Sequence, residues 1–147
     1  MRPNLSADRV NVLFVCTGNI CRSPTAEGVF LHLIRSRNLE SRIGVDSAGT
    51  GAWHQGEAPD PRSQETALSR GIDISTQQAR RVHTDDFYEF DLIVAMDSSH
   101  LHSLRADCPS TYADRLRLFM EYAPETRITD VPDPYYGAGD GFARVFD

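Results

Sequence analysis

The chain has 147 residues, of which 40% are hydrophobic and 24% are charged, a composition typical of a single soluble globular domain. Its formal net charge of −6 leaves no broad basic face for a phosphate backbone, which argues against a nucleic-acid partner. Three cysteines, no apolar leader and no membrane-length apolar run point to the cytoplasm and away from a membrane.

Polar residues without periodicity open the chain, so we expect residues 1–9 to be a flexible leader and residues 10–147 to form the domain. The β-branched and aromatic run Val12–Val15 predicts a buried strand that ends at Cys16. Helical periodicity follows over residues 23–38 and predicts a helix that covers the sheet. Its inward stripe is predicted to comprise Ala26, Val29, Phe30, Leu33 and Arg37.

Strand and helix patterns alternate along the rest of the chain. Strands are predicted over residues 42–47, 91–96 and 115–119, helices over residues 61–70, 84–90, 98–106 and 140–147, and a loop over residues 124–136. This alternation predicts an α/β fold with a mainly parallel sheet and helices on both faces. Ligands of such sheets bind beyond the carboxyl ends of the strands, where Cys16 lies.

A loop joins the first strand to the first helix, and its ends are Cys16 and Arg22. It contains Gly18 and Asn19, the residue types that enter positive φ most readily, so its N–H groups can turn inward as an anion nest. The following helix N-terminus adds positive potential, and the Arg22 guanidinium can bind two phosphate oxygens at once. Thiols in such pockets ionise readily, so Cys16 is expected to be a thiolate that attacks phosphorus and forms a phosphocysteine.

The stretch C-T-G-N-I-C-R-S-P, followed by T-A-E-G, resembles the signature of the low-molecular-weight protein tyrosine phosphatases, and the chain is identified as a bacterial-type member. The resemblance implies a four-stranded parallel sheet in a flavodoxin-like arrangement. It also implies hydrolysis of phosphotyrosine in tyrosine-phosphorylated proteins, with a cognate tyrosine kinase as a candidate partner. We expect a monomer without cofactor or metal. The phosphate-binding residues implied by the match are Thr17, Gly18, Asn19, Ile20, Cys21 and Arg22.

Hydrolysis of a phosphomonoester requires a proton on the leaving oxygen, so a carboxylic acid must face the loop from elsewhere in the chain. Asp133 is the candidate, because prolines bracket it in V-P-D-P-Y-Y and stiffen its loop. The D-P-Y-Y stretch resembles the general-acid loop of the family, which implies that Asp133 donates the proton and later activates water. An aspartate before a proline is also a common turn element.

Several residues are expected to support the loop. Ser23 can donate its hydroxyl to the Cys16 sulfur, or it can cap the helix. The family match implies that Asn19 holds a left-handed turn with help from Ser47, and that a histidine assists at the position of Gln77. Gln77 can supply a hydrogen bond there but no titrating imidazole.

Aromatic residues indicate the substrate. Trp53 follows the second strand, and Tyr135 and Tyr136 follow the proposed acid. Aromatic walls around a phosphate site would favour phosphotyrosine over the shorter phosphoserine, although Trp53 could instead belong to the core. Cys21 can form a reversible disulfide with Cys16, or it can be a packing residue.

Four other functions compete with this interpretation. An arsenate reductase of the same fold would need two further cysteines near the third strand, and the chain has none between Cys21 and Cys108. Protein-arginine phosphatases resemble the loop but carry a threonine where Ile20 stands. A non-catalytic phosphate-binding module is expected to lose the nucleophile or the acid. Arg22 and Asp133 favour hydrolysis over phosphate transfer to a sugar.

Two further features complete the pattern. Asp97, His100 and His102 are interpreted as one polar helix face rather than as a metal site. The last predicted helix stops at Asp147 after about two turns, whereas members of the family usually continue it.

Overall fold

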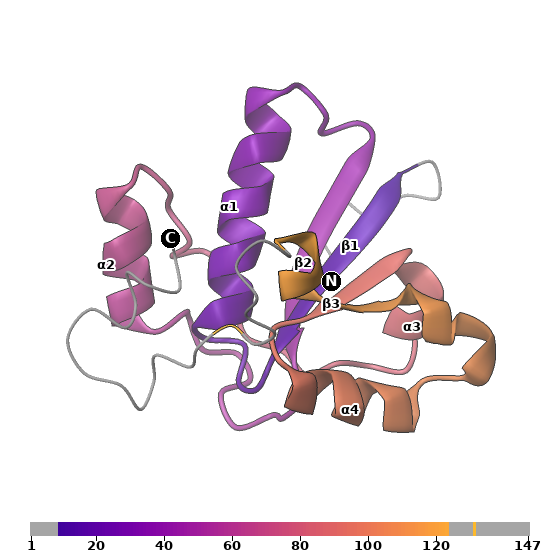
Figure 1. Cartoon of the computed structure of the whole chain (residues 1–147). Helices are drawn as coiled ribbons and strands as arrows, with labels where there is room; N and C mark the ends of the chain where they lie inside the picture. Colours follow the sequence, from indigo (N-terminus) through magenta and orange to yellow (C-terminus); the bar gives the residue numbers. More distant parts are fainter. Residues whose placement is uncertain (1–8, 124–130, 132–147) are drawn as a thin grey trace.

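The computed structural model describes residues 9–123 and residue 131. Its four strands are β1 (Val10–Cys16), β2 (Ile43–Gly49), β3 (Leu92–Ala95) and β4 (Leu116–Leu118). All of them are parallel, in the order β2-β1-β3-β4, and Figure 1 shows the resulting twisted sheet. Val12 of β1 pairs with Val45 on one side and Leu92 on the other. The predicted four-stranded parallel sheet is confirmed, and the Cys16 end of β1 lies in its middle.

The helices of the described chain are α1 (Arg22–Ser36), α2 (Pro61–Ser69), α3 (Asp86–Glu89) and α4 (Ser98–Asp107), with two short 3₁₀ helices, η1 (Ser110–Arg115) and η2 (Phe119–Tyr122). Side chains cap two of them, because Asp60 accepts the N–H of Arg62 at 2.8 Å and Asp97 accepts the N–H of His100 at 3.0 Å. The α-helices and strands predicted within this range are confirmed. The 3₁₀ helices have no periodic apolar pattern and were not predicted.

Helices cover both faces of the sheet, so the strands are buried on both sides. Within β1, Val12 and Phe14 face α1, whereas Leu13 and Val15 face α3 and α4. The cluster on the α3 and α4 side comprises Leu13, Val15, Ala48, Phe87, Phe90, Ile93, Ala95, Leu101, Leu104 and Leu116. A strand buried on both faces needs a continuous apolar run, which is what residues 12–15 supply.

One detail of α1 differs from prediction. Leu33, expected to face the sheet, is 43% exposed, whereas Ile34 is only 2% exposed and packs in the cluster under α1. Phe30 packs edge-on against Phe14, with ring centroids 5.6 Å apart. The inward stripe therefore runs through Phe30 and Ile34, the spacing of four that a helix of 3.6 residues per turn allows.

The chain outside residues 9–123 contributes one described position. Val131 donates its backbone N–H at 2.8 Å to the carbonyl of Met96, the residue that follows β3. Val131 therefore lies beside the carboxyl end of β3. The predicted leader, most of the loop over residues 124–136 and the helix over residues 140–147 lie outside the described residues. Within the described chain, no helix combines the length and the apolar character that crossing a membrane requires.

Candidate active site

The loop from Cys16 to Arg22 connects β1 directly to α1, as predicted. Asn19 has φ of 58°, in the left-handed region, where asparagine is tolerated far better than most residues. Gly18 is not in that region, so the prediction for it was wrong. Its missing side chain serves close packing instead, because a Cβ there would lie 2.9 Å from Cδ2 of His54. A larger residue at this position would therefore displace the His54 side chain.

Residues outside the loop hold its backbone carbonyls. The hydrogen bonds are Thr50 N–H to Cys16 O at 2.9 Å, Gly51 N–H to Thr17 O at 3.1 Å and Asp60 N–H to Ile20 O at 2.7 Å. A trans peptide points its C=O and N–H in opposite directions, and the described chain has no cis peptide. The N–H groups of Thr17, Gly18 and Cys21 therefore point to the opposite side, which is the arrangement of an anion nest.

Cys16 is buried and lies beside Ser23 at the start of α1. Its Sγ is 3.0 Å from the Ser23 hydroxyl, which itself accepts an N–H from the Asn19 amide at 2.8 Å. Because the amide occupies an oxygen lone pair, the serine proton is directed elsewhere. Sγ is its nearer acceptor, since the Ala48 carbonyl lies 3.4 Å away. Ser23 does not cap α1, whose N-cap is Cys21. The hydroxyl is in place to stabilise a Cys16 thiolate.

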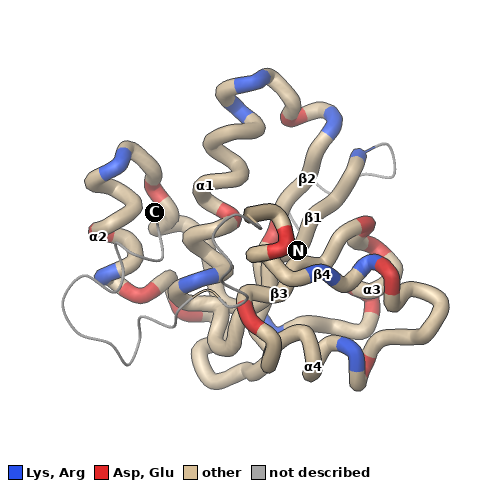
Figure 2. Tube along the Cα trace, viewed as in Figure 1, with Lys and Arg blue, Asp and Glu red and all other residues tan. Residues whose placement is uncertain are grey.

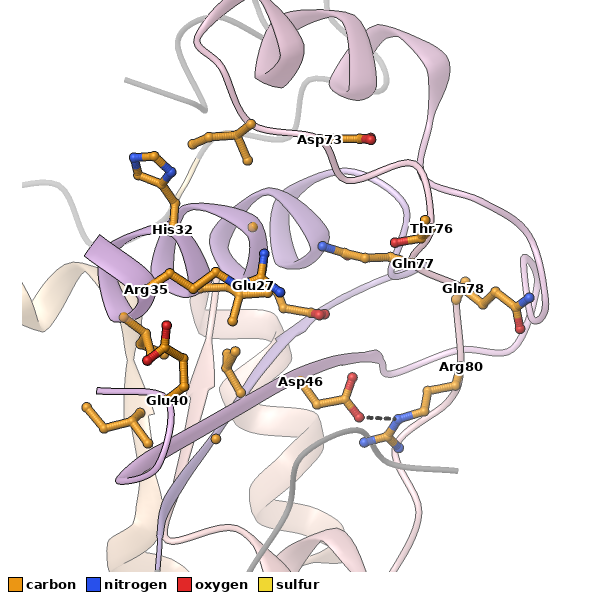
Figure 3. A pocket seen from close by; sticks show the side chains of 18 of the residues that line it. Glu27, His32, Arg35, Glu40, Asp46, Asp73, Thr76, Gln77, Gln78 and Arg80 are labelled. Atoms are coloured by element: carbon orange, nitrogen blue, oxygen red, sulfur yellow. Dashed lines mark hydrogen bonds and ion pairs between the residues drawn. The ribbon is translucent and has the colours of Figure 1, made fainter. Parts of the chain in front are cut away.

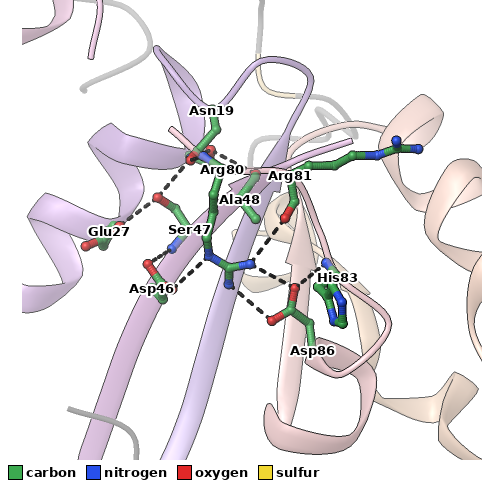
Figure 4. Close-up of polar contacts among 10 residues, drawn as sticks. Asn19, Glu27, Asp46, Ser47, Ala48, Arg80, Arg81, His83 and Asp86 are labelled. Atoms are coloured by element: carbon green, nitrogen blue, oxygen red, sulfur yellow. Dashed lines mark hydrogen bonds and ion pairs between the residues drawn. The ribbon is translucent and has the colours of Figure 1, made fainter. Parts of the chain in front are cut away.

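A second branch of hydrogen bonds runs from Asn19 toward a buried carboxyl group. The Asn19 amide donates to the Ser47 hydroxyl at 2.9 Å, and Ser47 donates to Oε1 of Glu27 at 2.6 Å. Figure 4 shows this branch beneath the loop. Burial, with a smaller repulsion from Asp46, raises the pKa of Glu27 to about 7, against the hydrogen bond from Ser47, which lowers it. Glu27 is therefore partly protonated at neutral pH.

Arg80 connects the loop residue Asn19 to acidic residues of the surrounding fold. Its backbone N–H donates to Oδ1 of Asn19 at 3.0 Å, and its guanidinium contacts Asp46 at 3.1 Å and Asp86 at 3.0 and 3.2 Å. Burial raises the pKa of Asp46, although Arg80 opposes the shift. Gln77 does not join this network, because its amide donates to the Pro24 carbonyl at 3.2 Å. The acceptors and donors around Asn19 and Ser47 are instead Glu27 and the Arg80 backbone.

Arg22 is 4% exposed, and residues far from it in the sequence hold its guanidinium. Its Nη1 donates to Oδ2 of Asp97 at 2.8 Å and to the Val131 carbonyl at 3.0 Å. Its Nη2 lies 3.4 Å from Nε2 of His100. Hydrogen bonds from Arg22, His100 and Ser99 lower the pKa of Asp97 against the opposing effect of its burial. The Arg22 guanidinium therefore has a defined orientation beside the loop.

Asp97 and His100 are the functional residues that the sequence pattern missed. The interpretation of Asp97, His100 and His102 as a polar helix face was wrong for the first two, which contact Arg22, while His102 is exposed. Asp97 comes one residue after the third predicted strand, at the same sheet edge as Cys16. This position at the carboxyl end of a strand is where ligands of parallel sheets bind, and it was the sequence signal that could have identified Asp97 as a site residue. Among the described residues, no group of three potential ligands could hold a metal ion.

The remaining predicted residues fall into two groups. Ile20 and Cys21 are buried and pack with Ala79, while Thr17 is exposed at the open side of the loop. Trp53 is 74% exposed, so its alternative assignment to the core was wrong. Its ring lies directly over Gly51, where a Cβ would overlap it, and the N–H of Gly51 donates to the loop. Asp133, Tyr135 and Tyr136 lie outside the described residues.

Charge and cavities distinguish the loop from other surfaces. Figure 2 shows acidic and basic residues scattered over the elements, so attraction for an anion is local to the loop. A cavity of about 1090 Å³ lies elsewhere, between α1, β2 and residues 71–80, and Figure 3 shows Glu27, Asp46 and Arg80 in its wall. Neither Cys16 nor Arg22 lines it. The candidate site is assigned to the loop because of the chemistry of its residues and not because of its volume.

Comparisons with known proteins identify the family of this chain. The model of the family described as low molecular weight phosphotyrosine protein phosphatase matches residues 11–147. A protein of that name from Schizosaccharomyces pombe is 48% identical over 138 residues, which cover 93% of this chain and 88% of the relative. The low molecular weight protein-tyrosine-phosphatase YfkJ of Bacillus subtilis is 42% identical over 127 residues, covering 86% of this chain and 81% of the relative.

Solved structures give the same result. The crystal structure of YfkJ from B. subtilis matches with a TM-score of 0.89 at 40% identity, over 94% of this chain and 86% of that one. A Drosophila protein described as an arginine phosphatase matches with a TM-score of 0.84 at 36% identity, over 92% of this chain and 87% of that one. The sequence and the fold place this chain in the low molecular weight phosphotyrosine protein phosphatase family.

Proposed function

We propose that the protein is a protein-tyrosine phosphatase that hydrolyses phosphotyrosine through a phosphocysteine on Cys16. The observation that carries the proposal is the contact of 3.0 Å between the Cys16 sulfur and the Ser23 hydroxyl, within a loop whose carbonyls are held from outside. A thiolate there lies below the N–H groups that would bind a phosphate. Arg22 begins the helix that follows the loop and supplies the positive charge.

The first step transfers the phosphoryl group to sulfur. The loop N–H groups and Arg22 bind the phosphate oxygens, and Cys16 attacks phosphorus in line with the departing oxygen. The S–P bond forms as the P–O bond to tyrosine breaks, and the phenol oxygen takes a proton from Asp133. Val131, two residues before Asp133, accepts a hydrogen bond from Arg22, so chain connectivity supports this assignment.

The second step regenerates the thiol site. The Asp133 carboxylate takes a proton from water, whose oxygen attacks phosphorus, and the S–P bond breaks to release inorganic phosphate. The sulfur leaves as a thiolate, which the Ser23 hydroxyl stabilises. Cys16, Arg22 and Asp133 supply nucleophile, positive charge and proton, so we propose a reaction without a metal or an organic cofactor.

Depth and aromatic residues support tyrosine as the substrate side chain. Cys16 is 3% exposed, so a phosphate must reach some distance into the protein. The exposed ring of Trp53 lies above the loop neighbour Gly51, and Tyr135 and Tyr136 follow the proposed acid in the sequence. We assign these aromatic residues to the walls that sandwich a phenyl ring. Substrates would then be tyrosine-phosphorylated proteins.

Phosphoarginine is the second candidate substrate, because the Drosophila arginine phosphatase has a similar fold. Ile20 distinguishes the two assignments, since the resemblance places a threonine there in arginine phosphatases. Ile20 is 8% exposed and packs with Cys21 and Ala79. This apolar packing favours the tyrosine assignment. We further propose that the protein acts as a monomer in the cytoplasm, opposed there by a tyrosine kinase.

Phosphate release from matched phosphotyrosine, phosphoserine and phosphoarginine peptides tests the proposal, with and without a chelator. We expect preferential release from phosphotyrosine that the chelator leaves unchanged. The matched variant is Ile20→Thr. It should shift the preference from phosphotyrosine toward phosphoarginine if the residue at position 20 determines the substrate preference. Preferential release from phosphoarginine by the native chain would contradict the tyrosine assignment, and release from no peptide would contradict the enzymatic function itself.

A further inference from the structure

A buried histidine joins the phosphate loop to the arginine. His100, in the first turn of α4, is 2% exposed. Its Nε2 lies 2.7 Å from the Thr17 hydroxyl and 3.4 Å from Nη2 of Arg22. Its Nδ1 lies 3.2 Å from Oδ1 of Asp97, the residue that caps the same helix. One imidazole therefore contacts a loop residue, the arginine and the carboxylate that holds the arginine.

The hydrogen bonds of Nε2 depend on which ring nitrogen carries the proton. A guanidinium has donors and no acceptor, so the 3.4 Å contact between Nε2 and Nη2 of Arg22 is a hydrogen bond only when Nε2 is unprotonated. The proton of a neutral ring then resides on Nδ1, beside the Asp97 carboxylate. In that tautomer the Thr17 hydroxyl donates to Nε2 at 2.7 Å. Nε2 has one lone pair, so Thr17 is its main donor and the longer contact with Arg22 shares the same lone pair.

The contacts also define how the guanidinium lies. Nη1 is directed to Asp97 and Val131, and Nη2 is directed to His100. These contacts set the plane of the guanidinium, whose paired N–H groups bind oxyanions side by side. Loss of the His100 contact would remove one of the groups that hold this plane.

We propose that His100 is a positioning residue of the phosphate site, which orients the Arg22 guanidinium and the Thr17 hydroxyl for phosphate binding. This inference rests on the proposed function, since it assigns a role within the same site. It concerns binding geometry, however, and not the chemical step. Small displacements of a phosphate-binding group have large effects, so we expect loss of the His100 acceptor to weaken phosphate binding by about 10-fold or more.

The test compares two substitutions of His100 with inorganic phosphate as the probe. His100→Leu removes both nitrogens, whereas the amide oxygen of His100→Gln can accept from Thr17 and Arg22. We expect His100→Leu to raise the phosphate dissociation constant, measured by calorimetry, about 10-fold and to raise KM for a phosphotyrosine peptide in parallel. His100→Gln should remain within about threefold of the native protein. His102→Leu, an exposed histidine on the same helix, is the matched control and should change neither value.

A merely structural role predicts a different result. His100→Leu and His100→Gln would then lower the melting temperature, and the folded protein would bind phosphate with unchanged affinity, which would overturn the proposal. Thr17→Val examines the same contact from the loop if His100→Leu does not fold. Thr17→Val should raise the phosphate dissociation constant less than His100→Leu does. In a double variant that folds, the two increases should not add, because both substitutions remove the same hydrogen bond between Thr17 and His100.

Calorimetry separates this inference from the proposed function, because phosphate binding needs no turnover. Weaker binding in His100→Leu, together with a native chain that hydrolyses no phosphopeptide, would support the positioning role and contradict the phosphatase. Equal phosphate binding by the native chain and a folded His100→Leu would overturn the positioning role, whatever the turnover.

Discussion

Ser47 at the end of β2 donates its hydroxyl to Glu27 on α1, with 2.6 Å between the two oxygens, and this contact lies two hydrogen bonds from the Ser23 hydroxyl beside the nucleophile. The acceptor is a carboxyl group whose pKa is raised to about 7 by burial. Protonation of Glu27 therefore changes the charge beneath the phosphate loop in the physiological pH range.

Glu27→Gln should remove a pH dependence of stability. The pKa of Glu27 is about 7 in the folded protein, against an ordinary value of 4.5. Between these values the folded protein holds a proton that the unfolded chain releases, so the contribution of Glu27 to stability is full below 4.5 and falls as pH rises through 7. A shift of this size corresponds to a loss on the order of 3 kcal/mol between pH 4.5 and pH 8.

Urea unfolding at pH 5 and pH 8.5 measures the effect. Glu27→Gln keeps an uncharged acceptor for Ser47, so its stability relative to the native protein should rise with pH. Glu40→Gln replaces an exposed carboxylate near the end of α1 and is the matched control. Parallel pH profiles for Glu27→Gln and the native protein would show that Glu27 titrates normally.

Asn19 should be needed for activity through its amide and for stability through its backbone. Its amide donates to Ser23 and Ser47, while its φ of 58° disfavours most residues other than glycine and asparagine. Asn19→Ala and Asn19→Gly both remove the amide, and we expect kcat/KM to fall at least about 10-fold in both. Only alanine also meets the backbone penalty, so Asn19→Ala should be less stable than Asn19→Gly by about 1 kcal/mol.

Chemical denaturation and initial rates of both variants separate these two roles. Equal stability of the alanine and glycine variants would mean that the left-handed turn relaxes when the amide is lost. Activity near the native value in Asn19→Gly would mean that the loop does not depend on its hydrogen bonds to Ser23 and Ser47.

The nucleophile side of the site could be predicted because it is local. Cys16, Asn19 and Ser23 belong to one strand–loop–helix unit, so their spacing alone brings them together. Gly18 was misassigned because glycine serves two purposes. A glycine in a loop suggests a positive φ from its residue type alone. The close approach of His54 to Gly18 depends on a loop later in the chain, which the residue type does not reveal.

The arginine side could not be predicted in the same way, because it depends on sheet order. Asp97 and His100 reach Arg22 only because β3 lies next to β1, a neighbour relation that hydrophobic periodicity does not contain. Likewise, Leu33 and Ile34 are adjacent and equally apolar, and the packing of α1 on the sheet decides which of them is buried.

Ile34 and Leu33 provide a matched pair for stability. Ile34 is 2% exposed under α1, and truncation to alanine should leave a cavity that costs about 2–5 kcal/mol of unfolding free energy. Leu33 is 43% exposed, so Leu33→Ala should cost less than about 1 kcal/mol. Thermal and urea unfolding of the two variants measure the difference. Similar losses in both would mean that α1 is rotated from the position described.

Cys16→Ser should separate catalysis from binding. A serine hydroxyl is a poor nucleophile in a site without an adjacent base, so turnover of a phosphotyrosine peptide should be abolished. The loop backbone and Arg22 remain, so the variant should still bind inorganic phosphate in calorimetry. Cys108→Ser, at the end of α4, is the matched control and should keep native activity. Retained turnover in Cys16→Ser would exclude the phosphocysteine route.

Asp133→Ala should slow the reaction most where the leaving group is least acidic. A general acid contributes about 10²–10⁴-fold to the departure of a poor leaving group, and tyrosine leaves as a phenol of high pKa. The acidic p-nitrophenol needs little protonation, so kcat for p-nitrophenyl phosphate should fall far less than kcat for a phosphotyrosine peptide. Asp130→Ala, three residues earlier, is the control and should preserve both rates. Equal losses on the two substrates in Asp133→Ala would mean that this residue positions the substrate, and that another group supplies the proton.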